Sequence, residues 1–455
     1  TPDRFYSFDP VNEECKRYPR YPENRPSFNK DYDAVLDIFQ DRDNNIWLGT
    51  NGGGVCVLTP GVGFESVGYN PEPFKGLVNT RIMSVADDQN GNLWLGTIGS
   101  GIIWSPDRVN YYPVDYPEGV NNSFFFIIKY VYEDKNGRIW AGTNLGTFII
   151  EFDNGRPRLM NARTAFPASG FVNWQQTVSF LDTDNLFWQG TLEAGLVLRD
   201  KQNGYAVIKH FLKDEEASGD LYSNRISYLL QDSKKRIWLG TYNGLHTFSF
   251  KDTTIRLAED YFKISGDFTG NIITCLDEDG EGNIWVGTPN GLNKLTETSP
   301  GQFQVNYFTE TDGLASNFIK GISHDDEGNI WVSTNTGISK LIVTGTENRF
   351  VNFDESDGVK GKNFTEASVF RNRQGEIFFG GTFGLTWFSP GDIHEYKESS
   401  KPIFTGLALF NQPVEPGKKF DSEVILSKSI THTNELELSY RQNNFEIEFS
   451  ALDYK

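Results

Sequence analysis

Short apolar runs separated by turn residues follow one another along the whole chain, and one pattern recurs. It consists of an apolar residue, an aromatic residue, a variable residue, Gly and usually Thr. The eight copies are IWLGT at 46–50, LWLGT at 93–97, IWAGT at 139–143, FWQGT at 187–191, IWLGT at 237–241, IWVGT at 284–288, IWVST at 330–334 and IFFGG at 377–381. The aromatic residue, called the anchor below, recurs every 46 to 50 residues. So regular a period predicts a repeat protein built from one structural unit.

Each copy predicts four antiparallel strands, called A to D below. Strand A is an apolar run such as RIMSVADD (81–88), strand B carries the anchor, a Gly begins strand C, and strand D is variable. Four such strands in 40–50 residues are typical of one blade of a β-propeller. A single blade cannot bury both of its faces, so blades pack against one another around an axis. The large anchor side chains are therefore predicted to be buried between blades.

The turn between strands A and B has a recurring chemistry. The residue three positions before the anchor is Gly or Asn in seven of the eight copies, which predicts a positive φ. These residues are Asn44, Gly91, Gly137, Asn185, Lys235, Gly282, Gly328 and Gly375. An Asp often opens the same turn, where its side chain can accept hydrogen bonds from the backbone. Examples are Asp88, Asp134, Asp182 and Asp232.

The number of blades is open between seven and eight, and seven is preferred. The last copy, ending in GLTWFSP (384–390), lacks a strand D, and FESVGY (64–69) could supply it. Residues 63–397 would then form a seven-bladed β-propeller, with 1–62 as the end of a preceding propeller. The alternative is an eight-bladed ring closed by residues 5–18. Residues 398–455 predict the first strands of a β-sandwich that is cut short, so the chain is expected to be part of a longer protein.

Composition excludes several function classes. The net charge of −19 opposes binding to nucleic acid or to an anionic membrane surface. Three widely spaced cysteines, Cys15, Cys56 and Cys275, predict neither a disulfide framework nor a zinc site, and the last two are expected to be buried thiols. The chain has no run of 18 apolar residues and no nucleophile, phosphate-loop or zinc-protease motif. No cofactor, no metal and no catalytic residue is predicted.

The face that carries the D-to-A connections and the B-to-C loops is the candidate ligand face. An Asn stands 14 or 15 residues before six anchors, at Asn79, Asn173, Asn224, Asn271, Asn317 and Asn363. Each could cap a turn, or together they could form a ring of amides around the channel mouth. Neighbouring candidates are Arg81, Trp174, Glu193, Arg225, Tyr242 and Phe383. Aromatic rings beside amides and charged groups would suit a sugar, which stacks on rings and offers hydroxyls.

The repeat D-x-x-G-x-I-W-x-G-T-x-x-G-L resembles the two-component regulator propeller repeat. The tail LSYRQNNFEIEFSALDY (438–454) resembles the start of the Y_Y_Y β-sandwich domain that follows such propellers. Together they resemble the periplasmic sensor region of Bacteroides-type hybrid two-component systems. The resemblance implies an oligosaccharide ligand derived from a complex glycan, and signalling to polysaccharide-utilisation genes. It also implies a homodimer formed through the sandwich, and a membrane helix, histidine kinase and response regulator outside this chain.

Two other functions remain open from the residues alone. Carboxylates are numerous, so the chain could be a propeller hydrolase or lyase that acts on a polysaccharide. It could also be a non-catalytic scaffold that docks a protein through an apolar patch. The resemblance favours a receptor without catalytic activity in this part of the protein.

Overall fold

The computed structural model describes residues 5–9, 14–18, 35–40, 46–50, 54–58, 63–70, 76–77, 81–116, 127–171, 177–183, 186–213, 221–251, 254–257, 268–344, 347–393 and 403–450. The chain divides into two compact units. The first is Gly61–His394, and the second groups Thr1–Pro60 with Glu395–Lys455.

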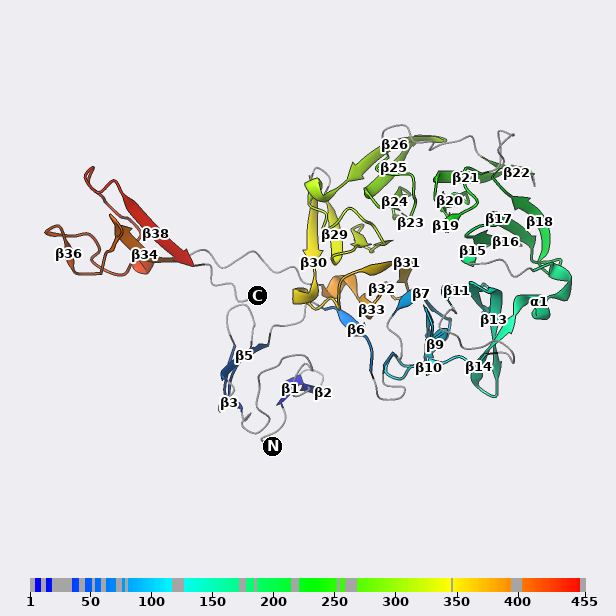
Figure 1. The fold of residues 1–455 in the computed structure, drawn as a ribbon, viewed down its shortest axis with the longest axis horizontal. Helices are drawn as coiled ribbons and strands as arrows, with labels where there is room; N and C mark the ends of the chain where they lie inside the picture. Colours follow the sequence, from blue (N-terminus) through cyan, green and yellow to red (C-terminus); the bar gives the residue numbers. More distant parts are fainter. Residues whose placement is uncertain are drawn as a thin grey trace. The chain divides into compact units, whose positions relative to one another are not determined.

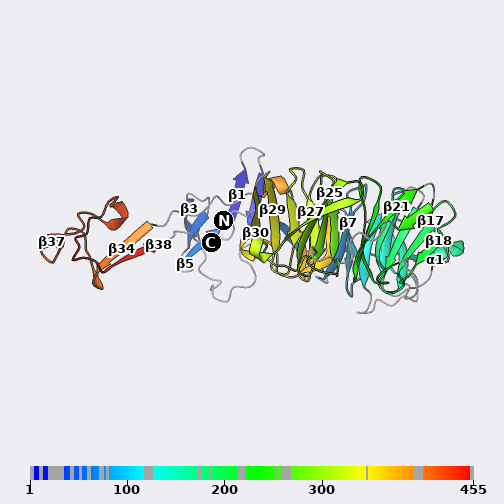
Figure 2. The same ribbon diagram turned by 90° about the horizontal axis from the view of Figure 1, so that it is seen from above.

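The Gly61–His394 unit is a ring of β-sheets around a central axis (Figure 1). Its described strands form seven four-stranded sheets, and neighbouring strands in each sheet run antiparallel. The first strand of each sheet faces the centre, and Figure 2 shows the strands standing across the thickness of the ring. The first strands of successive sheets contact one another around the whole circle. The unit is a seven-bladed β-propeller, so the predicted fold class is confirmed.

The blades follow the chain in order, with strand A innermost. Blade 1 consists of β7 (Ile82–Asp87), β8 (Leu93–Thr97), β9 (Ile102–Ser105) and β10 (Tyr112–Pro113). Blade 2 consists of β11 (Ile128–Glu133), β12 (Ile139–Thr143), β13 (Gly146–Asp153) and β14 (Arg156–Asn161). Blade 3 consists of β15 (Thr177–Thr183), β16 (Leu186–Thr191), β17 (Leu196–Asp200) and β18 (Ala206–Phe211). Blade 4 consists of β19 (Ile226–Gln231), β20 (Ile237–Thr241), β21 (Gly244–Lys251) and β22 (Thr254–Leu257). Blade 5 consists of β23 (Cys275–Glu278), β24 (Ile284–Thr288), β25 (Gly291–Ser299) and β26 (Gln302–Phe308). Blade 6 consists of β27 (Gly321–His324), β28 (Ile330–Ser333), β29 (Ile338–Thr344) and β30 (Glu347–Phe353).

Blade 7 is completed by a strand from the start of the unit. Its inner strands are β31 (Phe364–Arg371), β32 (Ile377–Gly381) and β33 (Gly384–Phe388). Its outer strand is β6 (Glu65–Val67), which pairs antiparallel with β33. Phe64 packs edge-on against Phe353 and Phe388, with ring centroids 5.3 and 5.0 Å away. The two ends of the ring therefore share one sheet, which closes the circle and leaves blade 7 with a complete set of four strands.

Helical segments are short and lie between strands. They are α1 (Ala162–Ala165) and the 3₁₀ turns η1 (Pro167–Ser169), η2 (Glu310–Asp312), η3 (Glu355–Asp357), η4 (Pro390–Asp392) and η5 (Ile430–His432). Within the described ranges, no helix is long and apolar enough to span a membrane.

The residues before the ring form two small sheets. β1 (Phe5–Asp9) pairs with β2 (Glu14–Tyr18) alone, so residues 5–18 do not supply the closing strand of an eight-bladed ring. β3 (Val35–Gln40), β4 (Ile46–Thr50) and β5 (Gly54–Leu58) form a three-stranded sheet. Its Leu36, Phe39 and Val55 side chains are exposed, as expected of a blade whose faces are not covered. The assignment of 1–62 to a preceding propeller stays a prediction.

The C-terminal residues form a small β unit with its own core. β38 (Phe445–Ser450) and β35 (Gln412–Pro413) flank β34 (Ile403–Leu409), and β36 (Lys419–Phe420) pairs with β37 (Glu423–Val424). The buried side chains of this core are Leu407, Leu409, Val414, Leu426 and Ile430. Assignment of 398–455 to a Y_Y_Y-type sandwich stays a prediction.

In five blades, a buried hydrogen bond ties the A-to-B turn to the Trp anchor. In blade 6, the Trp331 indole N–H donates to Asp325 Oδ2 at 2.8 Å, and Asp325 Oδ1 accepts the backbone N–H of Glu327 and Asn329. The same Asp–Trp bond, six residues apart, occurs at Trp94, Trp140, Trp238 and Trp285, at 2.8 to 3.0 Å. The predicted burial of these anchors is confirmed. The Asp both shapes the turn and satisfies a buried donor.

Blade 7 replaces both partners of this bond. Its anchor is Phe378, which has no N–H, and Asn372 stands where the other blades have Asp. Asn372 Oδ1 still accepts the backbone N–H of Gln374 and Glu376, but its amide donates to the Glu376 carboxylate at 2.6 Å. A carboxylate is needed only where an indole must be satisfied, so the two positions are chemically coupled.

The predicted positive φ of the A-to-B turn is confirmed at every copy that the structure describes. Gly91, Gly137, Gly282, Gly328 and Gly375 have φ of 76 to 85°, and Lys235 adopts 63°. Asn44 and Asn185 lie outside the described residues. Lys235 therefore adopts a conformation that is unfavourable for a residue with a Cβ.

Cysteine burial is confirmed for Cys275, which is a free buried thiol. Burial raises its pKa to about 12, so it is inert at neutral pH. The side chains of Cys15 and Cys56 lie outside the described set.

We expect Asp325→Asn and Trp331→Phe to be coupled. Asp325→Asn removes the acceptor of a buried indole N–H, whereas in a Trp331→Phe background that donor is already gone. The double variant should be about 1–2 kcal/mol more stable than the sum of the single effects predicts. Chemical denaturation followed by circular dichroism measures all four proteins, and additive effects would contradict the coupling.

Lys235→Gly should stabilise the propeller, because Gly adopts the left-handed turn without a steric penalty. The expected gain is about 0.5–1 kcal/mol in the free energy of unfolding. Gly282→Ala is the matched control at the same turn position of blade 5, where an added Cβ would make only an ordinary contact, 3.8 Å from Glu278 Oε1. It should lose about 1 kcal/mol, and a loss in Lys235→Gly would refute the interpretation.

Candidate functional site

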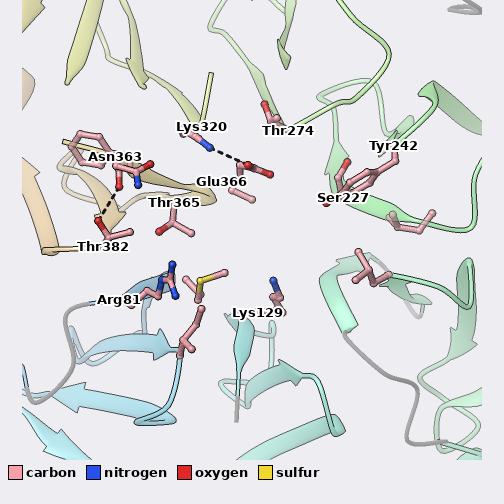
Figure 3. A pocket seen from close by; sticks show the side chains of 16 residues that line it. Arg81, Lys129, Ser227, Tyr242, Thr274, Lys320, Asn363, Thr365, Glu366 and Thr382 are labelled. Carbon is pink, nitrogen blue, oxygen red and sulfur yellow. Dashed lines mark hydrogen bonds and ion pairs between the residues drawn. The ribbon is translucent and has the colours of Figure 1, made fainter. Parts of the chain in front are cut away.

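A cavity of about 390 Å³ lies at the mouth of the central channel (Figure 3). Its walls are the starts of the inner strands and the B-to-C loops, so it opens on the predicted ligand face. It is lined by Arg81, Met83, Ile98, Lys129, Leu192, Ile226, Ser227, Tyr242, Thr274, Lys320, Asn363, Phe364, Thr365, Glu366, Ala367 and Thr382. These residues come from all seven blades, so only the closed ring assembles them.

One repeat position supplies much of this lining. The residue eleven positions before the anchor lines the cavity in blades 1, 2, 4, 5, 6 and 7. The residues are Met83, Lys129, Ser227, Thr274, Lys320 and Ala367. In blades 1, 2 and 4 this residue falls at a β-bulge, because the register shifts between the residues before and after it. A bulge leaves the extra residue out of the ladder and turns its side chain toward the axis.

The neighbouring position locks adjacent blades together. An Ile twelve residues before the anchor packs against the Gly of the preceding blade's Gly–Thr pair. A Cβ on Gly96 would lie 2.7 Å from Ile128, and one on Gly380 would lie 2.7 Å from Ile82, across the closure of the ring. The Gly is therefore required because the next blade's Ile occupies the space of its side chain.

Among the blade pairs that the structure describes at both positions, this packing is broken between blades 6 and 7. Blade 7 has Glu366 at the Ile position, and blade 6 has Ser333 at the Gly position. The register of β31 and β32 shifts between Phe364 and Val369, which inserts several residues into strand A. The insertion directs Glu366 into the cavity, where it forms an ion pair with Lys320 at 3.0 Å.

The inserted segment is held in a strained conformation. Ala367 has φ of 60° and Asn363 has φ of 76°, although neither is Gly. The Ala367 N–H donates to the Lys320 carbonyl at 2.8 Å, so the segment is pinned to blade 6. Backbone strain of this kind costs about 1–3 kcal/mol per residue and is concentrated at functional sites.

Charge and burial set the electrostatics of the cavity. Its described lining contains three cationic side chains and one carboxylate. Burial lowers the pKa of Lys129, Arg81 lowers it further, and Glu366 opposes this effect. Burial also raises the pKa of Tyr242, whose ring lies 4.5 Å from the Arg225 guanidinium.

Three of the predicted site residues line the cavity, namely Arg81, Tyr242 and Asn363. Arg225 stacks on Tyr242 from outside it. Phe383 instead packs edge-on against Phe364, with ring centroids 5.3 Å apart. Glu193 lies exposed on the B-to-C loop of blade 3.

Two of the described asparagines accept a backbone N–H with the side-chain oxygen, and a third does so with its backbone carbonyl. Asn224 Oδ1 accepts the Lys213 N–H at 2.6 Å, and Asn317 Oδ1 accepts the Glu310 N–H at 2.8 Å. The Asn271 carbonyl accepts the Gly244 N–H at 2.7 Å. The capping alternative therefore holds for Asn224 and Asn317, and among the described asparagines of the predicted ring only Asn363 lines the cavity. Asn79, Asn173 and Trp174 lie outside the described residues.

Sequence reasoning missed Lys129, Lys320 and Glu366. The signal was present in the repeat alignment, because the position eleven residues before the anchor varies from Met to Lys while its neighbour is usually Ile. A variable position beside a mostly apolar one in the innermost strand marks the side chains that face the channel.

At the other end of the inner strands, charged side chains bond several neighbouring blades to one another. Glu278 accepts the Ser233 backbone N–H at 2.7 Å, and Glu133 accepts the Gln89 N–H at 3.1 Å. His324 Nδ1 lies 2.8 Å from Asp277 Oδ2, and its Nε2 lies 3.3 Å from Arg371 Nη1. The hydrogen bond to Asp277 is the main cause that raises the pKa of His324, although burial and Arg371 oppose it. Among the residues that the structure describes, no cluster of three or more His, Cys, Asp or Glu could hold a metal.

The repeats match a known family model. The model for the two-component regulator propeller matches residues 30–52, 76–99, 121–145, 223–243, 267–290 and 313–336. Each match ends within a few residues of a Gly–Thr or Ser–Thr pair, so the model follows the same period as the anchors. The chain carries two-component regulator propeller repeats. The predicted resemblance to this repeat is confirmed.

Two similar solved structures are named as extracellular domains of hybrid two-component systems. The chain is 27% identical to a structure named as the extracellular domain of a hybrid two component system from B. thetaiotaomicron, with a TM-score of 0.67. This match covers 92% of this chain and 53% of the other. A second such domain from B. thetaiotaomicron, 20% identical with a TM-score of 0.56 over 98% of this chain and 57% of the other, shares the fold. Histidine kinase P4 of Formosa agariphila is 23% identical over 97% of this chain and 28% of its own length. The chain thus spans about half of these extracellular domains and a smaller part of the kinase.

The propeller should lose stability as the pH rises above about 6.5, because the folded-state pKa of His324 is raised above its ordinary value. The stabilisation is complete below the unfolded pKa and is lost as the pH rises through the folded pKa. Melting temperatures from about pH 6 to about pH 9 should fall less in His324→Gln than in the wild type. His432→Gln, an exposed histidine of the C-terminal unit, is the control. Parallel curves for wild type and His324→Gln would disprove the linkage.

Proposed function

We propose that this chain is part of the extracytoplasmic sensor region of a hybrid two-component system. In this proposal the region lies in the periplasm, is joined to a histidine kinase through a membrane helix outside this chain, and has no catalytic activity of its own. It binds an oligosaccharide derived from a complex glycan and signals to polysaccharide-utilisation genes. The likeness to extracellular domains of hybrid two-component systems supports the sensor role.

The observation that carries the ligand proposal is the cavity at the channel mouth. Its volume of about 390 Å³ falls within the range of small-ligand sites, about 300–1,000 Å³. The lining offers hydroxyls of Ser227, Thr274 and Thr365, one amide at Asn363, and the Tyr242 ring. Hydroxyls, amides and charged groups can read sugar hydroxyls, and an aromatic ring offers a stacking surface.

The enzyme and scaffold alternatives have less support. The single carboxylate of the cavity lining, Glu366, is held in an ion pair, whereas glycoside hydrolysis by the common mechanisms uses two carboxyl groups that flank one bond. A docking scaffold would call for a broad apolar patch, but the cavity is lined by polar and charged groups over much of its surface. Homodimerisation through the C-terminal β unit is part of the same proposal and follows from the resemblance to the sensor family.

An oligosaccharide that binds the native chain should raise its melting temperature, by mass action on the folded state. A library of glycan fragments should therefore contain at least one that raises it, with no product detected by chromatography. Tyr242→Ala should abolish the shift, because it removes the ring from the cavity wall. Tyr307→Ala, at an exposed position on outer strand β26, is the matched control. A ligand that is consumed would mean an enzyme, and an unchanged shift in Tyr242→Ala would place the site elsewhere.

A further inference from the structure

The cavity and the whole chain carry charges of opposite sign. Arg81, Lys129 and Lys320 against Glu366 give the described lining a formal charge of +2, whereas the chain has a net charge of −19. Concave walls of low dielectric constant focus such a local charge and concentrate counter-ions in the site. The cavity thus attracts anions in a protein whose overall charge repels them.

The propeller architecture does not require a cation at Lys129. The equivalent position holds Met, Ser, Thr or Ala in four of the other described blades. Burial disfavours the charged form of Lys129, Glu366 favours it and Arg81 disfavours it, and the pKa is lowered on balance. The ammonium is therefore held in the wall at an energetic cost. A bound anion would offset that cost, because an opposite charge within a few ångströms favours the ammonium.

The charges are divided between two sides of the cavity. Lys320 is already neutralised by Glu366 on one side, where its ammonium also lies 3.5 Å from the Phe318 ring centroid. Figure 3 shows Arg81 and Lys129 on the opposite side. Among the described lining residues, the side formed by blades 1 and 2 thus has two cationic groups, and the opposite side has an ion pair.

We propose that the ligand is an anionic oligosaccharide whose carboxylate or sulfate group lies between Arg81 and Lys129. The neutral part of the sugar then extends toward Tyr242 and the Lys320–Glu366 pair. This inference rests on the proposed function and adds the chemical class of its ligand. Both acidic groups are planar or tetrahedral oxyanions that accept charge-assisted hydrogen bonds from guanidinium and ammonium groups.

The experiment is calorimetry on the full chain with paired probes. Each uronic-acid oligosaccharide is compared with its carboxyl-reduced form, and each sulfated oligosaccharide with its desulfated form. We expect an acidic member to bind at least about tenfold more tightly than its neutral counterpart, since a hydrogen bond to a charged group is worth roughly that factor or more. The pair that responds also tells a carboxylate from a sulfate.

Substitutions in and outside the cavity test where the anionic group binds. Lys129→Gln should weaken binding of the acidic probe about tenfold or more, and Lys129→Arg should restore most of it. Glu366→Gln should strengthen binding, because it removes the opposing charge. Lys135→Gln is the matched control, since Lys135 lies exposed on the A-to-B turn of the same blade. Equal melting temperatures of these variants without ligand would establish that they are folded.

The outcomes separate the two proposals. If neutral probes bind as tightly as acidic ones and Lys129→Gln binds them normally, the anionic class is wrong and the receptor function stands. If acidic probes bind but Lys129→Gln and Lys135→Gln behave alike, the anion lies elsewhere and the inference fails. If neither member of any pair binds, both the inference and the proposed function fail.

Discussion

Closure of the ring is the constraint on which the rest of this structure depends. A four-stranded blade exposes two apolar faces, and each face is buried only when a neighbour covers it. Blades 2 to 6 find both neighbours along the chain, but blades 1 and 7 need each other, and blade 7 also needs an outer strand. The β6–β33 pairing supplies that strand, and Ile82 of blade 1 fills the space beside Gly380 of blade 7. The central cavity exists only because this last contact completes the circle.

Two kinds of interaction between repeat positions hold the blades in register. The Asp–Trp hydrogen bond fixes the A-to-B turn of five blades to a buried anchor, and Ile side chains fit against Gly positions of the preceding blade. In both kinds of pair, each residue fits its position only when its partner is present. In blade 7 both members of the first pair differ (Asn372 and Phe378), and at its interface with blade 6 both members of the second pair differ (Glu366 and Ser333). The exchange to Asn372 and Phe378 preserves the turn, whereas the exchange to Glu366 and Ser333 removes the Ile–Gly packing between the inner strands of blades 6 and 7.

The second exchange gives the channel mouth its chemistry. A regular blade 7 would place an Ile in the interface with blade 6, and Lys320 would lose its ion-pair partner. The inserted segment accepts left-handed backbone at Ala367 and puts a carboxylate into the cavity instead. Irregularity in an otherwise repetitive fold has a cost in stability, and such costs are found where function requires them.

The sequence by itself determined the repeat, the four-stranded blade, the buried anchors and the turn geometry, because each depends on residues close together in the chain. It also indicated the face on which a ligand would lie, and Arg81, Tyr242 and Asn363 do line the cavity there. It did not reveal Lys129, Lys320 and Glu366, nor that Asn224 and Asn317 cap the backbone. Those facts depend on which residue of each inner strand turns toward the axis, and on contacts between blades separated by tens to hundreds of residues. Only the closed tertiary structure decides them, since bulges in the inner strands and the packing of adjacent blades set the direction of each side chain.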